Sequence, residues 1–169
     1  MLRGQCGKAV DMANGIKAGD KAPDFTFTAQ SGERVRLYDR LASKVVVLYL
    51  YPKDETSRCT AEACAFRDSH EAFVDAGAEV IGVSSDSADK HAAFGSQHNL
   101  PFTLLSDKSS DVRKSYGFPA ILRLAPGRAT YVIDRTGTVR HTFNSMTNIS
   151  QHVSAALAMV KKLQPETLA

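Results

Sequence analysis

The chain has 169 residues, of which 43% are hydrophobic, and a formal net charge of +3. This length suits a single domain with one buried core. Charges of both signs are mixed along the chain without a basic block, so neither nucleic acid nor an acidic membrane surface is an expected partner. The longest apolar run, at 45–50, is too short to span a bilayer. We therefore expect a soluble protein.

Residues 1–17 contain no apolar core of the kind that a secretory signal needs, and few periodic hydrophobic residues. We interpret them as a flexible tail, a remnant of a processed targeting peptide or residues added for expression, and place the folded domain at 18–169. Cys6 lies in this segment and is expected to be incidental. The three cysteines of the chain are an odd number. That number argues against an extracellular disulfide framework and for reactive thiols in a reducing compartment.

The predicted elements alternate between strands and helices. Apolar and polar residues alternate at 21–28, which predicts a strand that returns at 35–38 as a hairpin, while the unbroken apolar run at 45–51 predicts a strand buried on both faces. Further strands are predicted at 78–84, 102–105, 129–134 and 138–143, the last two as a hairpin. Helices are predicted at 61–76, from a cap at 85–87 through His98, at 109–116 and from an Asn148 cap to Leu163. This order indicates an α/β fold with helices on both faces of a central sheet.

Cys59 lies where the buried strand at 45–51 passes into the next helix. Backbone N–H groups and the helix dipole favour a thiolate at a helix start. An exposed helix terminus contributes only about 0.3–1 kcal/mol, and a tenfold change in the thiolate fraction needs about 1.4 kcal/mol. A cation is therefore needed as well. Arg58 is adjacent and points away, and Arg67 lies two turns along, so we expect the decisive arginine to come from elsewhere in the chain.

Cys64 follows Cys59 by five positions. In one helix this spacing separates the two residues by about 140° around the axis and roughly 8 to 9 Å between Cα atoms. A disulfide needs Cα atoms within about 7 Å. A bridge would therefore require the first turn or two of the helix to unwind. The pattern predicts a redox switch that is helical when reduced and locally unfolded when oxidised.

The motif Pro52-x-x-x-Thr56-x-x-Cys59, between a buried strand and a helix, resembles the active-site motif of the peroxiredoxins. Cys64 five residues later is similar to the Q type, also called bacterioferritin comigratory protein. The likeness continues at 77–84, 100–107 and 126–134, and covers roughly 18–165. It implies a thioredoxin-like fold, with a central mixed sheet flanked by helices and an N-terminal hairpin. One departure is Ser57-Arg58, where family members often carry Pro-Gly.

By this resemblance, Cys59 is the peroxidatic cysteine, which attacks the peroxide O–O bond and becomes a sulfenic acid. Cys64 is the resolving cysteine, which forms an intramolecular disulfide with Cys59 that a thioredoxin-type donor reduces. Thr56 would hydrogen-bond the thiolate and the peroxide, and Pro52 would shield the pocket from water. Arg128, just before a predicted core strand, would be the distant cation.

The resemblance implies an antioxidant thiol peroxidase for hydrogen peroxide and alkyl hydroperoxides, active in cell redox homeostasis without a metal or an organic cofactor. The expected partner is thioredoxin, with neither nucleic acid nor a membrane involved. No cysteine lies near the C-terminus to pair with a partner subunit, so the dimer-linked mechanism of other peroxiredoxins is not expected. The chain is expected to be a monomer. The expected location is the cytoplasm for a bacterial source and the plastid for a photosynthetic eukaryote.

Other interpretations of the two cysteines stay open at this point. The chain could be a redox-switched sensor or holdase without peroxidase turnover, or Cys59 could be an inert buried thiol. A zinc site is disfavoured because no Cys-x-x-Cys or His-x-x-x-His pair is present. A cysteine hydrolase needs a histidine beside the thiol. His70 would lie about 16 Å along the helix, which leaves four histidines for the structure to place: His91, His98, His141 and His152.

Overall fold

The computed structural model describes residues 15–118 and 127–164. The strands within these residues are β1 (Thr26–Ala29), β2 (Arg34–Arg36), β3 (Val45–Leu50), β4 (Ala78–Ser84), β5 (Thr103–Ser106), β6 (Ala129–Ile133) and β7 (Val139–Asn144). They form one mixed sheet in the order β2-β1-β5-β4-β3-β6-β7. β4 runs parallel to both β3 and β5, whereas the remaining neighbours are antiparallel.

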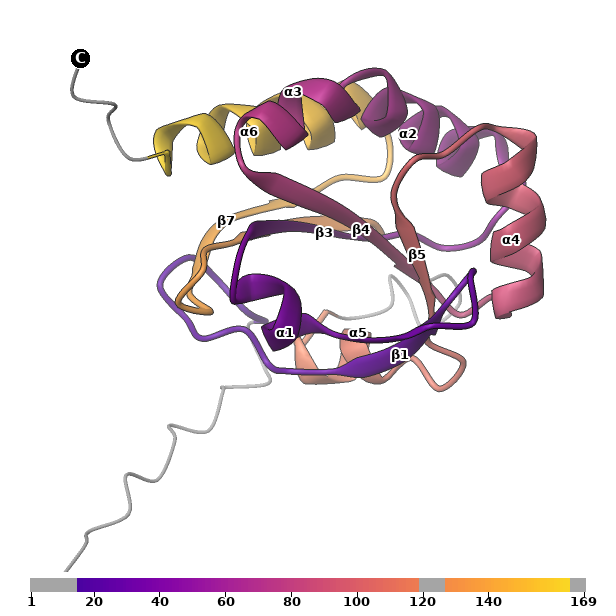
Figure 1. Ribbon diagram of the computed structural model, residues 1–169, viewed down its shortest axis with the longest axis horizontal. Coiled ribbons are helices and arrows are strands. Elements are labelled where there is room, and N and C mark those ends of the chain that lie inside the picture. Colours follow the sequence, from indigo (N-terminus) through magenta and orange to yellow (C-terminus); the bar gives the residue numbers. More distant parts are fainter. Residues whose placement is uncertain (1–14, 119–126, 165–169) are drawn as a thin grey trace, which may run out of the picture.

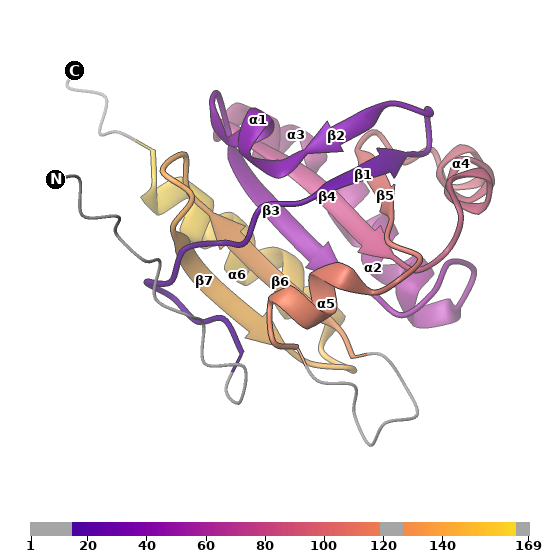
Figure 2. The same ribbon diagram turned by 90° about the horizontal axis from the view of Figure 1, so that it is seen from below.

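Helices cover both faces of this sheet. They are α1 (Leu37–Leu41), α2 (Ser57–Asp68), α3 (His70–Asp75), α4 (Ala88–Gln97), α5 (Asp111–Ser115) and α6 (Ile149–Lys162). In Figure 1, α2, α3 and α6 lie on one side of the sheet and α1 and α5 on the other, and Figure 2 shows α1 and α5 from their own side. This arrangement confirms the predicted α/β class, the mixed central sheet and the N-terminal hairpin. None of the helices in the described residues is long and apolar enough to cross a membrane.

β3 is buried along its whole length, as its unbroken apolar sequence predicts. Leu48 and Leu50 enter the core cluster that α1 and α5 help to form. Val47, Tyr49 and Tyr51 enter the cluster beneath α2, α3 and α6. The loop that follows Leu50 therefore leaves the sheet from a strand that is fixed on both faces.

The N-terminal hairpin is shorter than the alternating pattern predicts. β1 covers only the end of the predicted strand at 21–28, and Leu37 and Tyr38, predicted as strand, begin α1. Leu37 and Leu41 are both buried at the i,i+4 spacing of a helix face. The Asp24 side chain accepts a hydrogen bond from the Tyr38 amide at 3.2 Å. These contacts override the local alternation, so the strand prediction was wrong for these two residues.

The helix predicted at 61–76 begins earlier and is divided. α2 starts at Ser57, because the Thr56 side chain caps it. Ser69 leaves helical geometry at φ −100° and ψ 4°, and α3 begins at the next residue. Gly77 follows with a φ of +79°, the left-handed conformation expected of a residue beyond a helix end.

Two predicted helix caps are confirmed in the structure. The Ser87 side chain accepts from the Lys90 amide at the start of α4. The Asn148 side chain accepts from the Gln151 amide at the start of α6. The helix predicted at 109–116 is shorter, since α5 begins at Asp111. The sequence also predicts a loop at 121–128 with Pro126-Gly127 as its turn, and most of this loop lies outside the described residues.

Most of the predicted tail, with Cys6, also lies outside the described residues. Its last residues are described. Ile16 is buried in the core, and its amide donates to the Tyr116 carbonyl at 2.9 Å. Ile16 therefore packs against the folded domain, and the boundary at residue 18 stays a prediction.

Candidate active site

Cys59 lies in the first turn of α2 and is only 1% exposed. Its amide donates to the Thr56 hydroxyl oxygen at 3.4 Å, and the same hydroxyl donates to the Lys53 carbonyl at 3.3 Å. Thr56 thus fixes both the end of the preceding loop and the start of the helix. The sulfur lies at the positive end of the helix dipole, where an anion is favoured.

A guanidinium group contacts the sulfur of Cys59. Nη2 of Arg128 donates to Sγ at 3.2 Å, across 69 positions of sequence. Arg128 directly precedes β6, and the pairing of Leu50 with Ala129 brings the start of β6 beside the end of β3. This arginine comes from a distant part of the chain, as the helix-dipole estimate required. Arg58, the neighbour of Cys59 in sequence, is exposed.

The second terminal nitrogen of Arg128 donates to the carboxylate of Glu62, and both side chains are buried. Burial raises the pKa of Glu62 to about 7, although the charge and the hydrogen bond of Arg128 oppose this change. Burial alone would lower the pKa of Arg128, but the negative charges of Glu62 and Cys59 raise it overall. Arg128 is therefore a permanently charged group. Its ion pair with Glu62 holds it in place while it donates a hydrogen bond to Cys59.

Sequence reasoning missed Glu62, because an acidic side chain on a helix is most often a solvated one. A signal was present. Glu62 follows Cys59 by three positions, which places both on the same face of a helix. Ala63 and Phe66, close to Glu62 on α2, are buried against the sheet. A carboxylate among such neighbours requires a buried cation, and this requirement points to the arginine that Cys59 also needs.

His152 lies near Oε1 of Glu62, the carboxylate oxygen that Arg128 does not bind. Its Nε2 donates to the Ser145 carbonyl at 2.7 Å, which leaves Nδ1 to accept from the Thr130 hydroxyl at 2.8 Å. Nδ1 is 3.7 Å from Oε1 of Glu62. Burial lowers the pKa of His152, the Ser145 bond opposes this, and the positive charge of Arg128 lowers it further. The imidazole is therefore a neutral neighbour of the Glu62 carboxylate, and sequence reasoning did not place it here.

Cys64 lies within α2 and is half-buried, and the helix continues unbroken from Ser57 to Asp68. Cys59 and Cys64 are both free thiols. This geometry corresponds to the helical state that the spacing argument assigns to the reduced protein. Pro52 is half-buried at the start of the loop that leads to Thr56.

The geometry bears on the alternatives left open by the sequence. The contact of Cys59 with a charged guanidinium distinguishes it from an inert thiol buried among apolar groups. Within residues 15–118 and 127–164, no three His, Cys, Asp or Glu side chains are grouped as metal ligands would be. Among the hydrogen bonds of the described residues, the Cys59 sulfur is paired with Arg128 and with none of the four histidines His91, His98, His141 and His152. A cysteine hydrolase is therefore disfavoured.

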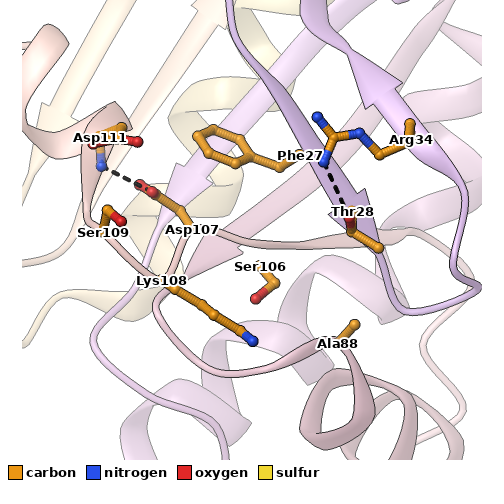
Figure 3. A pocket seen from close by; sticks show the side chains of 9 residues that line it. All are labelled: Phe27, Thr28, Arg34, Ala88, Ser106, Asp107, Lys108, Ser109 and Asp111. Atoms are coloured by element: carbon orange, nitrogen blue, oxygen red, sulfur yellow. Dashed lines mark hydrogen bonds between the residues drawn. The ribbon is translucent and has the colours of Figure 1, made fainter.

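A cavity of about 380 Å³ lies away from these residues (Figure 3). Strands β1, β2 and β5 and helices α4 and α5 contribute to its lining, which includes Arg34, Lys108 and Asp107. Both carboxylate oxygens of Asp107 accept amide hydrogen bonds at the start of α5. Arg34 donates to Thr28 at 3.4 Å. Asp107 and Arg34 therefore already have partners, and Cys59, Thr56 and Arg128 do not line this cavity.

Comparison with known proteins shows the family to which this chain belongs. The model of the AhpC/TSA family matches residues 18–142. A chloroplastic peroxiredoxin Q of Triticum aestivum is 44% identical over 159 residues, which is 94% of this chain and 70% of the relative. Its counterpart from Arabidopsis thaliana is 48% identical over 147 residues, covering 86% of this chain and 68% of the relative.

Solved structures agree with these sequence matches. The crystal structure of peroxidoxin BcpB from Mycobacterium tuberculosis superposes with a TM-score of 0.82 at 33% identity, covering 89% of this chain and 99% of that one. A peroxiredoxin Q of Xanthomonas campestris gives a TM-score of 0.77 at 26% identity, over 83% of this chain and 92% of that one. The predicted thioredoxin-like fold of the peroxiredoxins is thereby confirmed.

Proposed function

This chain belongs to the AhpC/TSA family and is a thiol peroxidase, and from this premise we propose how it completes a catalytic cycle. The observation that carries the proposal is the buried contact of Arg128 with both Cys59 and Glu62. One guanidinium with fixed donors can stabilise the thiolate and, in the same place, the charge that develops on the peroxide oxygens.

In the first step the Cys59 thiolate attacks one peroxide oxygen and the O–O bond breaks. The sulfur gains the oxygen with its hydrogen and becomes a sulfenic acid, oxidised by two electrons. The other oxygen leaves as hydroxide or alkoxide and takes a proton to form water or an alcohol. Arg128 and the Thr56 hydroxyl would orient the peroxide, and Pro52 would limit the access of water.

In the second step Cys64 resolves the sulfenic acid. The first turns of α2 unwind, and the Cys64 thiolate attacks the sulfur of Cys59. The S–S bond forms as hydroxide leaves and is protonated to water. A dithiol reductant of the thioredoxin type then restores both thiols through a mixed disulfide and is itself oxidised to a disulfide. The cycle needs no metal and no organic cofactor.

Substrates, assembly and location belong to the same proposal. The substrates are hydrogen peroxide and alkyl hydroperoxides, and the protein acts as a monomer, which sedimentation of the reduced and oxidised forms would test. The relatives named above from Triticum aestivum and Arabidopsis thaliana are described as chloroplastic. Their names support a plastid location for a chain from a photosynthetic eukaryote, and a bacterial chain would act in the cytoplasm.

The test is peroxide consumption with thioredoxin, thioredoxin reductase and NADPH. Cys59→Ser should abolish turnover, and Cys64→Ser should stop after one equivalent of peroxide. Appreciable turnover of Cys59→Ser would refute the assigned nucleophile, and sustained turnover of Cys64→Ser would refute the resolving role. A peroxide-induced disulfide without turnover in the wild type would lead to a glutaredoxin assay and, if that also failed, to the redox-sensor interpretation.

A further inference from the structure

The loop between β3 and α2 is anchored at Asp54, a residue to which the mechanism above gives no part. Asp54 is 4% exposed. Its amide donates to Oδ2 of Asp86 at 2.6 Å, and its own Oδ1 accepts from the Tyr51 hydroxyl at 2.6 Å. An anchoring carboxylate thus lies two residues before Thr56, whose hydroxyl accepts the Cys59 amide.

The remaining oxygen of Asp54 contacts His91 of α4. Nδ1 of His91 lies 2.6 Å from Oδ2 of Asp54, and Nε2 lies 3.1 Å from the Leu105 carbonyl. A carbonyl oxygen and an ionised carboxylate both only accept hydrogen bonds. With Asp54 ionised, both ring nitrogens of His91 donate and the contact is an ion pair. The side chains of His91 and Asp54 are 0% and 2% exposed.

This pair is costly to bury, and its position suggests why it is retained. Removing two charges from water opposes folding, and buried ion pairs that persist can serve to specify one conformation. Glu55, between Asp54 and Thr56, has a φ of +65°, a strained value for a residue other than glycine. Surrounding contacts must hold such a conformation in place. The Asp54 bonds to His91, Tyr51 and Asp86 are contacts of this kind.

We propose that His91 is a positioning residue for the reaction at Cys59. Through its bond to Asp54, it holds the loop in the conformation that places the Thr56 hydroxyl on the Cys59 amide. The inference rests on the proposed function, since its effect is expressed in the peroxide reaction. His91 of α4 thus connects its own helix and Leu105 of β5 to Cys59 through the loop between β3 and α2.

Two substitutions of His91 separate its two hydrogen bonds. The amide nitrogen of asparagine replaces Nδ1, so His91→Asn can keep the bond to Asp54 and loses the bond to Leu105. Glutamine replaces Nε2, so His91→Gln does the reverse. The control is His98→Gln at the end of the same helix, where the ring is half-buried against Phe94. The readout is the rate of Cys59 oxidation by hydrogen peroxide in single-turnover stopped flow.

We expect His91→Gln to lower the second-order rate constant by at least about tenfold, because a loop displacement of about 1 Å can cost far more. His91→Asn should stay within about threefold of the wild type, and His98→Gln within about twofold. A wild-type rate in His91→Gln, or an equal loss in both His91 variants, would overturn the inference. An inactive wild type would instead refute the proposed function, and the positioning role with it.

A measurement on the wild-type protein tests the bond from His91 to Asp54 even where a variant fails to fold. Nitrogen-15 NMR of the reduced wild type should show protons on both His91 ring nitrogens, with slow exchange at Nδ1. A ring without a proton at Nδ1 would remove the donated bond to Asp54 and with it the inference.

Discussion

At the scale of single residues, the site depends on how one guanidinium is shared between the side chains of Glu62 and Cys59. Arg128 gives one terminal nitrogen to Glu62 and the other to Cys59. The fork of an arginine has fixed geometry, whereas a lysine offers a single charged nitrogen on a flexible chain. The identity of the residue is therefore as important as its charge.

We predict that Arg128→Lys lowers the second-order rate constant for Cys59 oxidation by about 100-fold, the usual cost of one lost donor to a developing oxyanion. The retained positive charge will not compensate, because one ammonium cannot reproduce both bonds. Stopped-flow measurement of the peroxide reaction checks this. Arg58→Lys, at the exposed position beside Cys59, is the control and should react at the wild-type rate. Equal losses in both variants would contradict the model.

A second prediction concerns Glu62 and the pH dependence of the free energy of unfolding. Because burial raises its pKa from 4.5 to about 7 against the opposing effect of Arg128, the folded protein binds more protons than the unfolded chain between these values. The free energy of unfolding should therefore fall as the pH rises through this window. Urea denaturation at pH 5 and pH 8 should show a fall smaller by roughly 1–3 kcal/mol in Glu62→Gln. Parallel profiles for the two proteins would exclude this titration.

Cys59 and Glu62 also show the reach of sequence reasoning at this scale. The motif and the helix start identified Cys59. Arg128 was assigned through resemblance alone, because no local pattern reveals a contact across 69 positions. Glu62 was missed because its burial depends on that same contact. The helix-face position of Glu62 could have indicated it, but only the fold identifies its distant partner.

At the scale of elements, α2 carries both cysteines and is the segment on which the proposed cycle depends. The sequence pattern predicted a helix in this segment but did not predict the residues at which it begins and ends. Periodicity predicted one helix through Ala76, and the break at Ser69 arises where the chain turns from α2 into α3. The short helix α1 escaped prediction for a related reason. Its five residues are too few for a periodic pattern, and tertiary contacts of Leu37 and Asp24 determine it.

If the disulfide forms as proposed, the first turns of α2 must open. We predict that one equivalent of peroxide raises hydrogen exchange of the amides at 60–64 by at least about tenfold, because their helical bonds are lost on unwinding. Mass spectrometry of the reduced and oxidised proteins measures this, with the amides of α6 as an internal control. A disulfide that forms with unchanged protection in α2 would contradict the spacing argument. Cys64→Ser should show no such change.

At the scale of the whole molecule, the packing between the sheet and α2 depends on a glycine in a central strand. On the face of α2, Gly82 of β4 leaves room for the ring of Tyr49. An added Cβ would lie 2.7 Å from Cζ and 2.8 Å from the hydroxyl oxygen of Tyr49, and 2.9 Å from Leu104. The ring of Tyr49 also stacks on Phe66 of α2 at 4.6 Å between centroids. A glycine in a central strand thus supports the helix that bears Cys59.

We predict that Gly82→Ala lowers the free energy of unfolding by about 1–3 kcal/mol through overpacking. Gly95→Ala is a matched control, because its added Cβ would meet the same Leu104 at 3.9 Å, an ordinary contact. Gly95 lies within α4, so alanine there should stabilise the protein by about 0.5–1 kcal/mol. Urea denaturation compares the two. A wild-type midpoint for Gly82→Ala would show that Tyr49 can move aside without cost.

The antiparallel pairing of β3 with β6 has a consequence for the newly made chain. A polypeptide leaves the ribosome from its N-terminus, and domains fold as their residues emerge. Cys59 is therefore released 69 residues before the arginine that contacts its sulfur. Until β6 is added, the nascent thiol lacks its cation. The nascent thiol should therefore react more slowly with peroxide than Cys59 of the folded chain, where Arg128 contacts the sulfur.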